Sequence, residues 1–195
     1  MIAMAKKFDF QPDKPHSGFF AKLYLTKKQR KGLLKWALYG LVLLVLSVLQ
    51  DVMLCHVRVF GATTDLIPCG IFLICLIEGS ERGSVFALCA STVYLFSGFS
   101  PGAACIVFIT AIGVGICLFR QGYLQQGFRA TLLCLAIALI VYELAVFALG
   151  MVLGLTHFGR IAGFGITTLL TYVAVPILYP VVLAIQNLGG NPWKE

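Results

Sequence analysis

Charged residues are scarce in this chain. Lys, Arg, Asp and Glu together make up 12% of its 195 residues, whereas soluble domains carry about 25%. Hydrophobic residues make up 59%, and the mean hydropathy is +0.93. One small soluble core could not hide this much apolar surface, so the composition predicts a protein that uses lipid as the solvent for most of its surface.

Signatures of catalysis and of metal binding are also missing. The sequence has no glycine-rich phosphate loop, no HExxH and no Ser/His/Asp spacing. Its seven cysteines form no CxxC pair and lie in or beside apolar runs, which is typical of small buried hydrophobes rather than of a disulfide framework or a metal site. We therefore expect no enzyme, no metal and no cofactor. The cysteines are Cys55, Cys69, Cys75, Cys89, Cys105, Cys117 and Cys134.

Six apolar runs predict an all-α membrane protein, a compact bundle of about six transmembrane helices. The fifth and sixth are full length for a hydrocarbon core of about 30 Å. The second covers only about 18 Å at about 1.5 Å per residue, so it must borrow flanking residues or sit inside the bundle. Asp65 is expected to cap it, with Pro68 in the first turn. The runs are Leu33–Leu54, Leu66–Ile77, Ser84–Ser97, Ala103–Phe119, Ala130–Leu155 and Ile161–Ile185.

Basic residues are concentrated ahead of the first run, where nine of the fifteen lie within the first 35 positions. With the N-terminus inside, thirteen Lys and Arg fall on the inner side and two, Arg58 and Arg160, on the outer side. The positive-inside rule then places both termini in the cytoplasm. The expected organisation is a basic cytoplasmic tail (1–32), a six-span domain (33–187) and a short cytoplasmic tail (188–195).

The basic tail could attract nucleic acid, but it abuts a membrane span. Anionic lipid is therefore the expected partner, at about 1 kcal/mol per well-placed cation. Residues 19–35 either form a helix that lies in the membrane interface or act only as a charged flank that fixes topology. The residues expected to bind lipid are Lys27, Lys28, Arg30 and Lys31.

The segment EGSERG, residues 78–83, separates the second and third runs. Glu81 and Arg82 are expected at the water boundary, and Gly79 and Gly83 permit a tight reversal with positive φ. Two interpretations stay open for this hinge. It is either a turn at the membrane surface or, in addition, a docking surface for a cytoplasmic partner.

Glu143 lies near the centre of the fifth run. An ionisable group at that depth costs a few kcal/mol and usually faces protein or water. Gly150 shares its helical stripe and Gly154 follows one turn further, and small residues on a stripe let another helix approach closely. We therefore expect Glu143, Gly150 and Gly154 to serve either bundle packing or contact with a partner or ligand.

Residues 61–83, GATTDLIPCGIFLICLIEGSERG, resemble the MreD family of bacterial rod-shape-determining membrane proteins. The likeness continues through FALCASTVYLFSGFSPGA and covers about residues 45–120. Thr64 stands where the family has proline, and Leu95 where it commonly has an acidic residue. The matching residues are Gly61, Asp65, Leu66, Glu78, Gly79 and Gly83.

The resemblance implies a non-enzymatic scaffold of the cell-wall elongation complex in the bacterial plasma membrane. Its implied partners are a bitopic MreC-like protein, the MreB cytoskeleton and the synthase formed by RodA and a penicillin-binding protein. The implied fold is similar to the S-components that bind substrate for vitamin transporters. The alternative function is therefore substrate capture for an energy-coupling-factor transporter, although the first run lacks the small-residue repeats that such subunits use for docking.

Overall fold

The computed structural model describes residues 27–52, 56, 62–97, 100–123 and 127–188. Within these residues the chain is an all-α bundle, which confirms the expected fold class. A short 3-10 helix, η3 (Phe158–Arg160), leads into the last α-helix. The α-helices are α1 (Lys27–Val52), α2 (Leu66–Glu78), α3 (Ser80–Phe96), α4 (Ala104–Tyr123), α5 (Phe128–Val152) and α6 (Ile161–Leu188).

Four of these helices, α1, α4, α5 and α6, are long and apolar enough to cross a membrane. Their outward faces carry large apolar side chains that are more than half exposed, such as Leu44, Val107 and Leu169. In a membrane these side chains would meet lipid, which is as apolar as they are. The chain is therefore a membrane protein, and each predicted run corresponds to one of the six α-helices.

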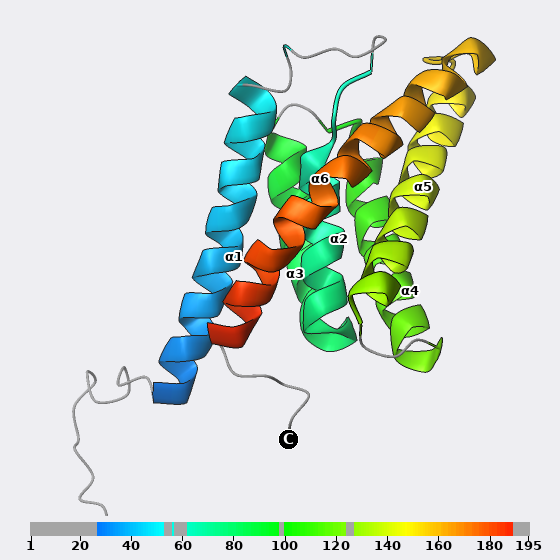
Figure 1. The fold of residues 1–195 in the computed structure, drawn as a ribbon. Helices are drawn as coiled ribbons and strands as arrows, with labels where there is room; N and C mark the ends of the chain where they lie inside the picture. Colours follow the sequence, from blue (N-terminus) through cyan, green and yellow to red (C-terminus); the bar gives the residue numbers. More distant parts are fainter. Residues whose placement is uncertain (1–26, 53–55, 57–61, 98–99, 124–126, 189–195) are drawn as a thin grey trace, which may run out of the picture.

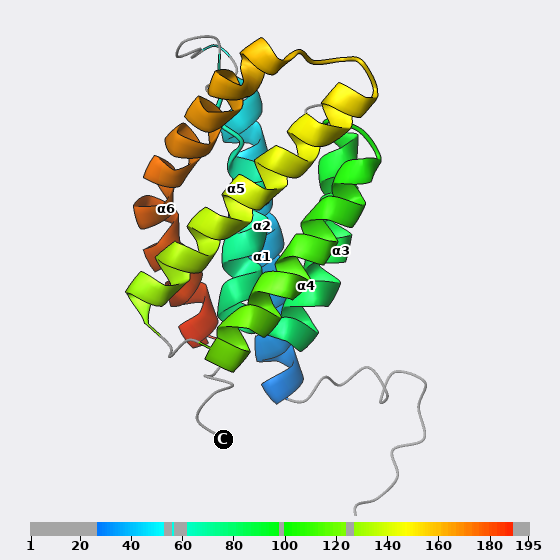
Figure 2. The ribbon, with the colours of Figure 1, turned by 90° about the vertical axis from the view of Figure 1, so that its right-hand side faces the viewer.

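Helix α2 forms the centre of the bundle. All of its thirteen residues are buried, and it contacts each of the other five α-helices. Figures 1 and 2 show α2 enclosed, with α6 running diagonally from the end of α5 to the start of α1. Of the two alternatives left open for the short second run, the structure supports a place inside the bundle, because thirteen residues rise only about 20 Å and the other helices surround them.

The bundle has two ends with different contents. We call the end that holds Lys27, Gly79 and Leu188 the hinge end, and the opposite end, with Val52, Asp65 and Ile161, the cavity end (Figure 1). Apart from Arg160, the arginines and lysines of the described segments all lie toward the hinge end. This arrangement matches the alternation of sides on which the topology prediction was built.

Candidate functional site

The hinge between α2 and α3 depends on two glycines in two different ways. Gly79 has φ +90°, which favours glycine, and its N–H donates to the carbonyl of Cys75 at 3.0 Å. A Cβ on Gly83 would lie 2.9 Å from the Cα and the carbonyl oxygen of Cys75. The expected positive φ is therefore confirmed for Gly79 but wrong for Gly83, which sits inside α3 and lets the two helix backbones touch.

Glu78 is the last residue of α2 and is buried at the hinge end. Its Oε1 is 2.5 Å from the Lys35 ammonium and accepts a hydrogen bond from the Tyr39 hydroxyl at 2.5 Å. Lys35 is itself only 5% exposed. Glu81 and Arg82 are exposed, as predicted. In the sequence, Lys35 is one of the nine basic residues within the first 35 positions, and nothing there indicated this ion pair.

The last carbonyls of α2 are satisfied by side chains from other helices. Within α4, the Cys117 thiol donates to the carbonyl of Cys75 at 3.1 Å, and the Arg120 guanidinium donates to that of Leu76. The Gln186 amide of α6 donates to the carbonyl of Ile77 at 3.1 Å. A helix that ends inside a bundle needs such partners, because water cannot supply them.

The start of α2 is capped by Gln50 instead of Asp65. The Gln50 Oε1 accepts hydrogen bonds from the N–H groups of Leu66 and Ile67 at 2.8 and 3.3 Å. Asp65 occupies the N-cap position without a capping bond from its side chain. Its carboxylate instead accepts hydrogen bonds from the Tyr94 hydroxyl, at 3.1 and 3.2 Å, and from Gln50 Nε2 at 3.2 Å. The predicted cap was therefore wrong, because that carboxylate turns across the bundle.

Two of the predicted sites lie partly outside the described residues. Gly61 is one of these, and the side chains of Lys27 and Lys28 are others. Arg30 and Lys31 are exposed in the first turns of α1, at the hinge end. This position is compatible with contact to lipid head groups, and the prediction of lipid binding stands.

The glycines at 150 and 154 do not form a helix stripe. Helix α5 ends at Val152, and Gly154 follows with φ +70° in the turn. A Cβ on Gly150 would lie 2.9 Å from the Thr156 hydroxyl oxygen, so the loop already covers that face. The expected close-packing surface is therefore wrong at these two residues, because the positive φ ends the helix between them.

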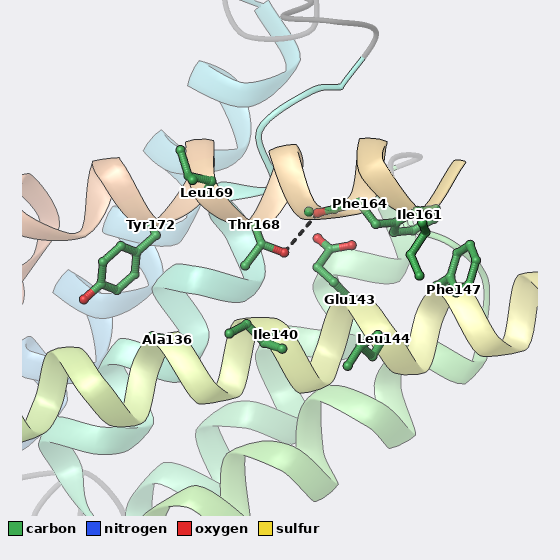
Figure 3. Close-up of a pocket in the computed structure, with 11 residues that line it drawn as sticks. Ala136, Ile140, Glu143, Leu144, Phe147, Ile161, Phe164, Thr168, Leu169 and Tyr172 are labelled. Atoms are coloured by element: carbon green, nitrogen blue, oxygen red, sulfur yellow. Dashed lines mark hydrogen bonds between the residues drawn. The ribbon is translucent and has the colours of Figure 1, made fainter. Parts of the chain in front are cut away.

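Glu143 is only 8% exposed and has no hydrogen bond or ion pair within the described parts of the chain. Its carboxylate points from α5 toward Phe164 and Thr168 of α6 (Figure 3). The side chain lines an apolar groove of about 400 Å³ between α5 and α6. The expectation that Glu143 is buried among helices holds, but the carboxylate is left without a partner.

A larger polar cavity of about 920 Å³ opens at the cavity end. Asp65, Glu143 and Arg160 all contribute to its lining, together with Tyr142 and Gln50. The sequence assigned Asp65 and Glu143 to separate sites. It gave Arg160 only a place in an outer loop, and no local pattern marked Gln50.

A second groove, of about 320 Å³, lies between α1 and α3. Small residues line much of it, among them Gly40, Ser47, Ala90 and Ser97. A Cβ on Gly40 would meet nothing within 4 Å. The surface is therefore open to a close approach by another helix.

No family model matches the chain, and neither a curated protein nor a solved structure matches it.

Proposed function

We propose that this chain is a non-enzymatic membrane scaffold of the bacterial cell-wall elongation complex and that it binds a bitopic MreC-like partner. One observation carries the proposal: the residues that resemble the MreD family build the centre of the bundle. Asp65 and Glu78 anchor the two ends of α2, and Gly79 and Gly83 join it to α3. The resemblance thus falls on residues whose roles in the fold are specific.

The groove between α1 and α3 is the surface that suits the single span of such a partner. Membrane helices associate by close packing, because lipid offers no hydrophobic driving force between them, and small residues allow that packing. Gly40 and Ser47 lie two turns apart on α1, and Ala90 and Ser97 face them from α3. This surface replaces the stripe expected at Gly150 and Gly154.

Co-expression with a bitopic MreC-type protein from the same organism tests the proposal. Gly40→Leu should abolish co-purification while the chain stays folded, because the new side chain meets open space. Gly115→Leu is the matched control, since Gly115 is also an exposed helical glycine with nothing within 4 Å of an added Cβ. Undiminished binding by Gly40→Leu would exclude this surface.

A cross-linking experiment sharpens the same test. Cys89 is an exposed free cysteine in the groove, so it can form a disulfide with cysteines placed along the partner's span. Cross-linking should be strongest at one position of the partner's span and should reappear only three or four positions to either side, on the same helix face. If the wild type binds no MreC-type protein and instead recovers an ATPase module and a vitamin, the transporter function replaces the scaffold.

The proposed orientation places the hinge end in the cytoplasm and the whole chain in the bacterial plasma membrane. The bias of basic residues toward that end supports it. Ser80→Cys and Leu155→Cys, each in a background without native cysteines, test the orientation in intact cells. An impermeant thiol reagent should label Leu155→Cys only, and labelling of Ser80→Cys instead would invert the topology.

The remaining partners of the proposed complex are MreB, RodA and its penicillin-binding protein. They follow from the resemblance alone, and the exposed turn at Glu81 and Arg82 is the surface that faces the proposed cytoplasmic side. If this turn docks the cytoplasmic partner, charge reversal of both residues should reduce recovery of MreB. Binding of the MreC-type protein should be retained and serves as the control. Unchanged recovery of MreB would leave the hinge a structural turn.

A further inference from the structure

The polar cavity and the α5–α6 groove lie side by side. Glu143 and Phe164 line both of them, so the two spaces meet at these side chains between α5 and α6. The cavity is lined by Gln50 near the end of α1 and by Ala162 and Gly163 near the start of α6. The groove lies along α5 and α6 (Figure 3). A polar compartment at the end of the bundle is therefore next to an apolar groove on its flank.

The two compartments differ sharply in chemistry. The cavity contains the carboxylates of Asp65 and Glu143, the guanidinium of Arg160 and the hydroxyl of Thr167. The groove is walled by aliphatic and aromatic side chains, including Ile140, Leu144, Phe147 and Leu169. A molecule that filled both would need a polar head and an apolar chain.

The cavity also holds buried polar groups that the protein itself does not satisfy. Glu143 has no hydrogen bond or ion pair within the described segments, although it is more than nine-tenths buried. The Tyr142 hydroxyl is fully buried, and within the described residues its one polar neighbour is the Tyr94 hydroxyl, which already donates to Asp65. Because an unpaired polar group at such a site costs free energy, these two residues are suited to bind a ligand rather than to hold helices together.

The charges of the lining favour a head group that carries an ammonium. Two carboxyl groups and one guanidinium line the cavity, and the Asp65 carboxyl is already held by Gln50 and Tyr94. An ammonium beside Glu143 would supply the hydrogen-bond donors that this side chain lacks within the described residues. Arg160 would remain free to bind a phosphate, since a guanidinium matches phosphate oxygens well. Hydrogen bonds between an ammonium and a carboxylate are among the stronger ones in proteins.

We infer that the cavity and the adjacent groove together bind an amphiphile with a primary ammonium head group, of the aminophospholipid class. The ammonium lies at Glu143, the phosphate at Arg160, and one acyl chain follows Ile140 and Leu144 between α5 and α6. This site is separate from the α1–α3 groove proposed for the partner helix. Lipid binding and partner binding can therefore fail independently.

Native mass spectrometry of the full chain tests the inference with defined lipids. Phosphatidylethanolamine should be retained over phosphatidylglycerol and phosphatidylcholine of equal acyl chains, because only the first offers an ammonium with N–H donors. Glu143→Gln should weaken phosphatidylethanolamine binding about tenfold and leave phosphatidylglycerol unchanged. Equal binding of phosphatidylethanolamine by wild type and Glu143→Gln, or equal retention of the three lipids by the wild type, would overturn the inference.

Gly165 provides an independent test of the acyl-chain part of the site. It lines the groove, and an added Cβ would meet nothing within 4 Å, so Gly165→Leu should fill the groove without disturbing the fold. Lipid binding should then fall about tenfold or more, while Gly115→Leu keeps wild-type binding. Unchanged lipid binding by Gly165→Leu would overturn the inference.

Two further outcomes identify other occupants. If soluble glycerophosphoethanolamine competes as well as the intact lipid, the site takes a soluble amine and the amphiphile is excluded. If Gly165→Leu abolishes recovery of the MreC-type partner and leaves lipid binding intact, the groove is a helix site and the inference is again overturned. The Gly40→Leu variant should lose the partner and retain the lipid, which separates this test from that of the scaffold function.

Discussion

The two ends of α2 hold their buried carboxylates in different ways. At the hinge end, Glu78 contacts both the Lys35 ammonium and the Tyr39 hydroxyl. At the cavity end, Asp65 is held by Gln50 and Tyr94, but Glu143 has no partner within the described residues and faces a large opening. The contrast separates polar groups that fix helices in place from polar groups that are available to a ligand.

The difference follows from what a short helix needs inside a membrane. Backbone groups at both ends of α2 lack intrahelical partners, and in a buried helix other parts of the protein must supply them. The hinge end meets this need with Cys117, Arg120 and Gln186, and the cavity end with Gln50. The carboxylate of Glu143 takes no part in either arrangement, so its removal should not loosen α2.

The largest expected effect comes from breaking the buried ion pair. Lys35→Met leaves Glu78 without its cation and should lower the free energy of unfolding by about 3–5 kcal/mol, measured by SDS titration in mixed micelles. Arg160→Met, which alters the one arginine or lysine at the cavity end among the described residues, should cost less than about 1 kcal/mol. Equal losses of unfolding free energy in Lys35→Met and Arg160→Met would contradict the idea that only the hinge end depends on a buried ion pair.

A second comparison uses one glycine from each end. Gly83→Ala forces a methyl group against the backbone of Cys75 and should cost about 1–3 kcal/mol of unfolding free energy. Gly163→Ala, in the lining of the cavity, meets nothing within 4 Å and should stabilise α6 by about 0.5–1 kcal/mol. The same SDS titration measures both, and no loss of stability in Gly83→Ala would show that α2 and α3 have room to separate.

Removal of the cap at the start of α2 should have a moderate effect. Gln50→Leu takes the acceptor away from the N–H groups of Leu66 and Ile67, at a cost of about 1 kcal/mol. The loss stays moderate because the neighbouring Asp65 carboxylate can turn and cap the helix in its place. Ser47→Leu, one turn earlier on the lipid-facing groove, should leave the unfolding free energy within about 0.5 kcal/mol. If Gln50→Leu lowered the free energy of unfolding by more than Lys35→Met does, the ranking of the two ends would be reversed.

The smallest effect on stability is expected four residues before Lys35 on the same helix. Lys31 is exposed, so Lys31→Gln should change the unfolding free energy by less than about 0.5 kcal/mol. The same substitution should weaken binding of the isolated 1–35 segment to anionic vesicles in a salt-sensitive way. Salt-independent binding would leave the basic segment with a topological role alone.

Much of this fold can be predicted from the sequence, because helices follow local patterns of apolar residues. The apolar runs locate the six helices approximately, and the length of the second run leaves two possibilities for α2, borrowed flanking residues or a place inside the bundle. The packing of the other helices around α2 decides between them. The positive φ at Gly79 is equally local, since the chain must reverse between two apolar helices within one or two residues. The low charge and high hydropathy predict that lipid is the solvent for most of the protein's surface.

The candidate site depends on how those helices are rotated and crossed, which no local pattern encodes. Lys35 and Glu78 meet across 43 positions, Gln50 caps a helix that begins 16 residues later, and Asp65 and Glu143 come to line one cavity. The glycine spacing at 150 and 154 misled for the same reason, because a backbone with positive φ ends α5 between them. Periodicity shows which residues share a helix face, whereas the packing of all six helices decides what that face meets.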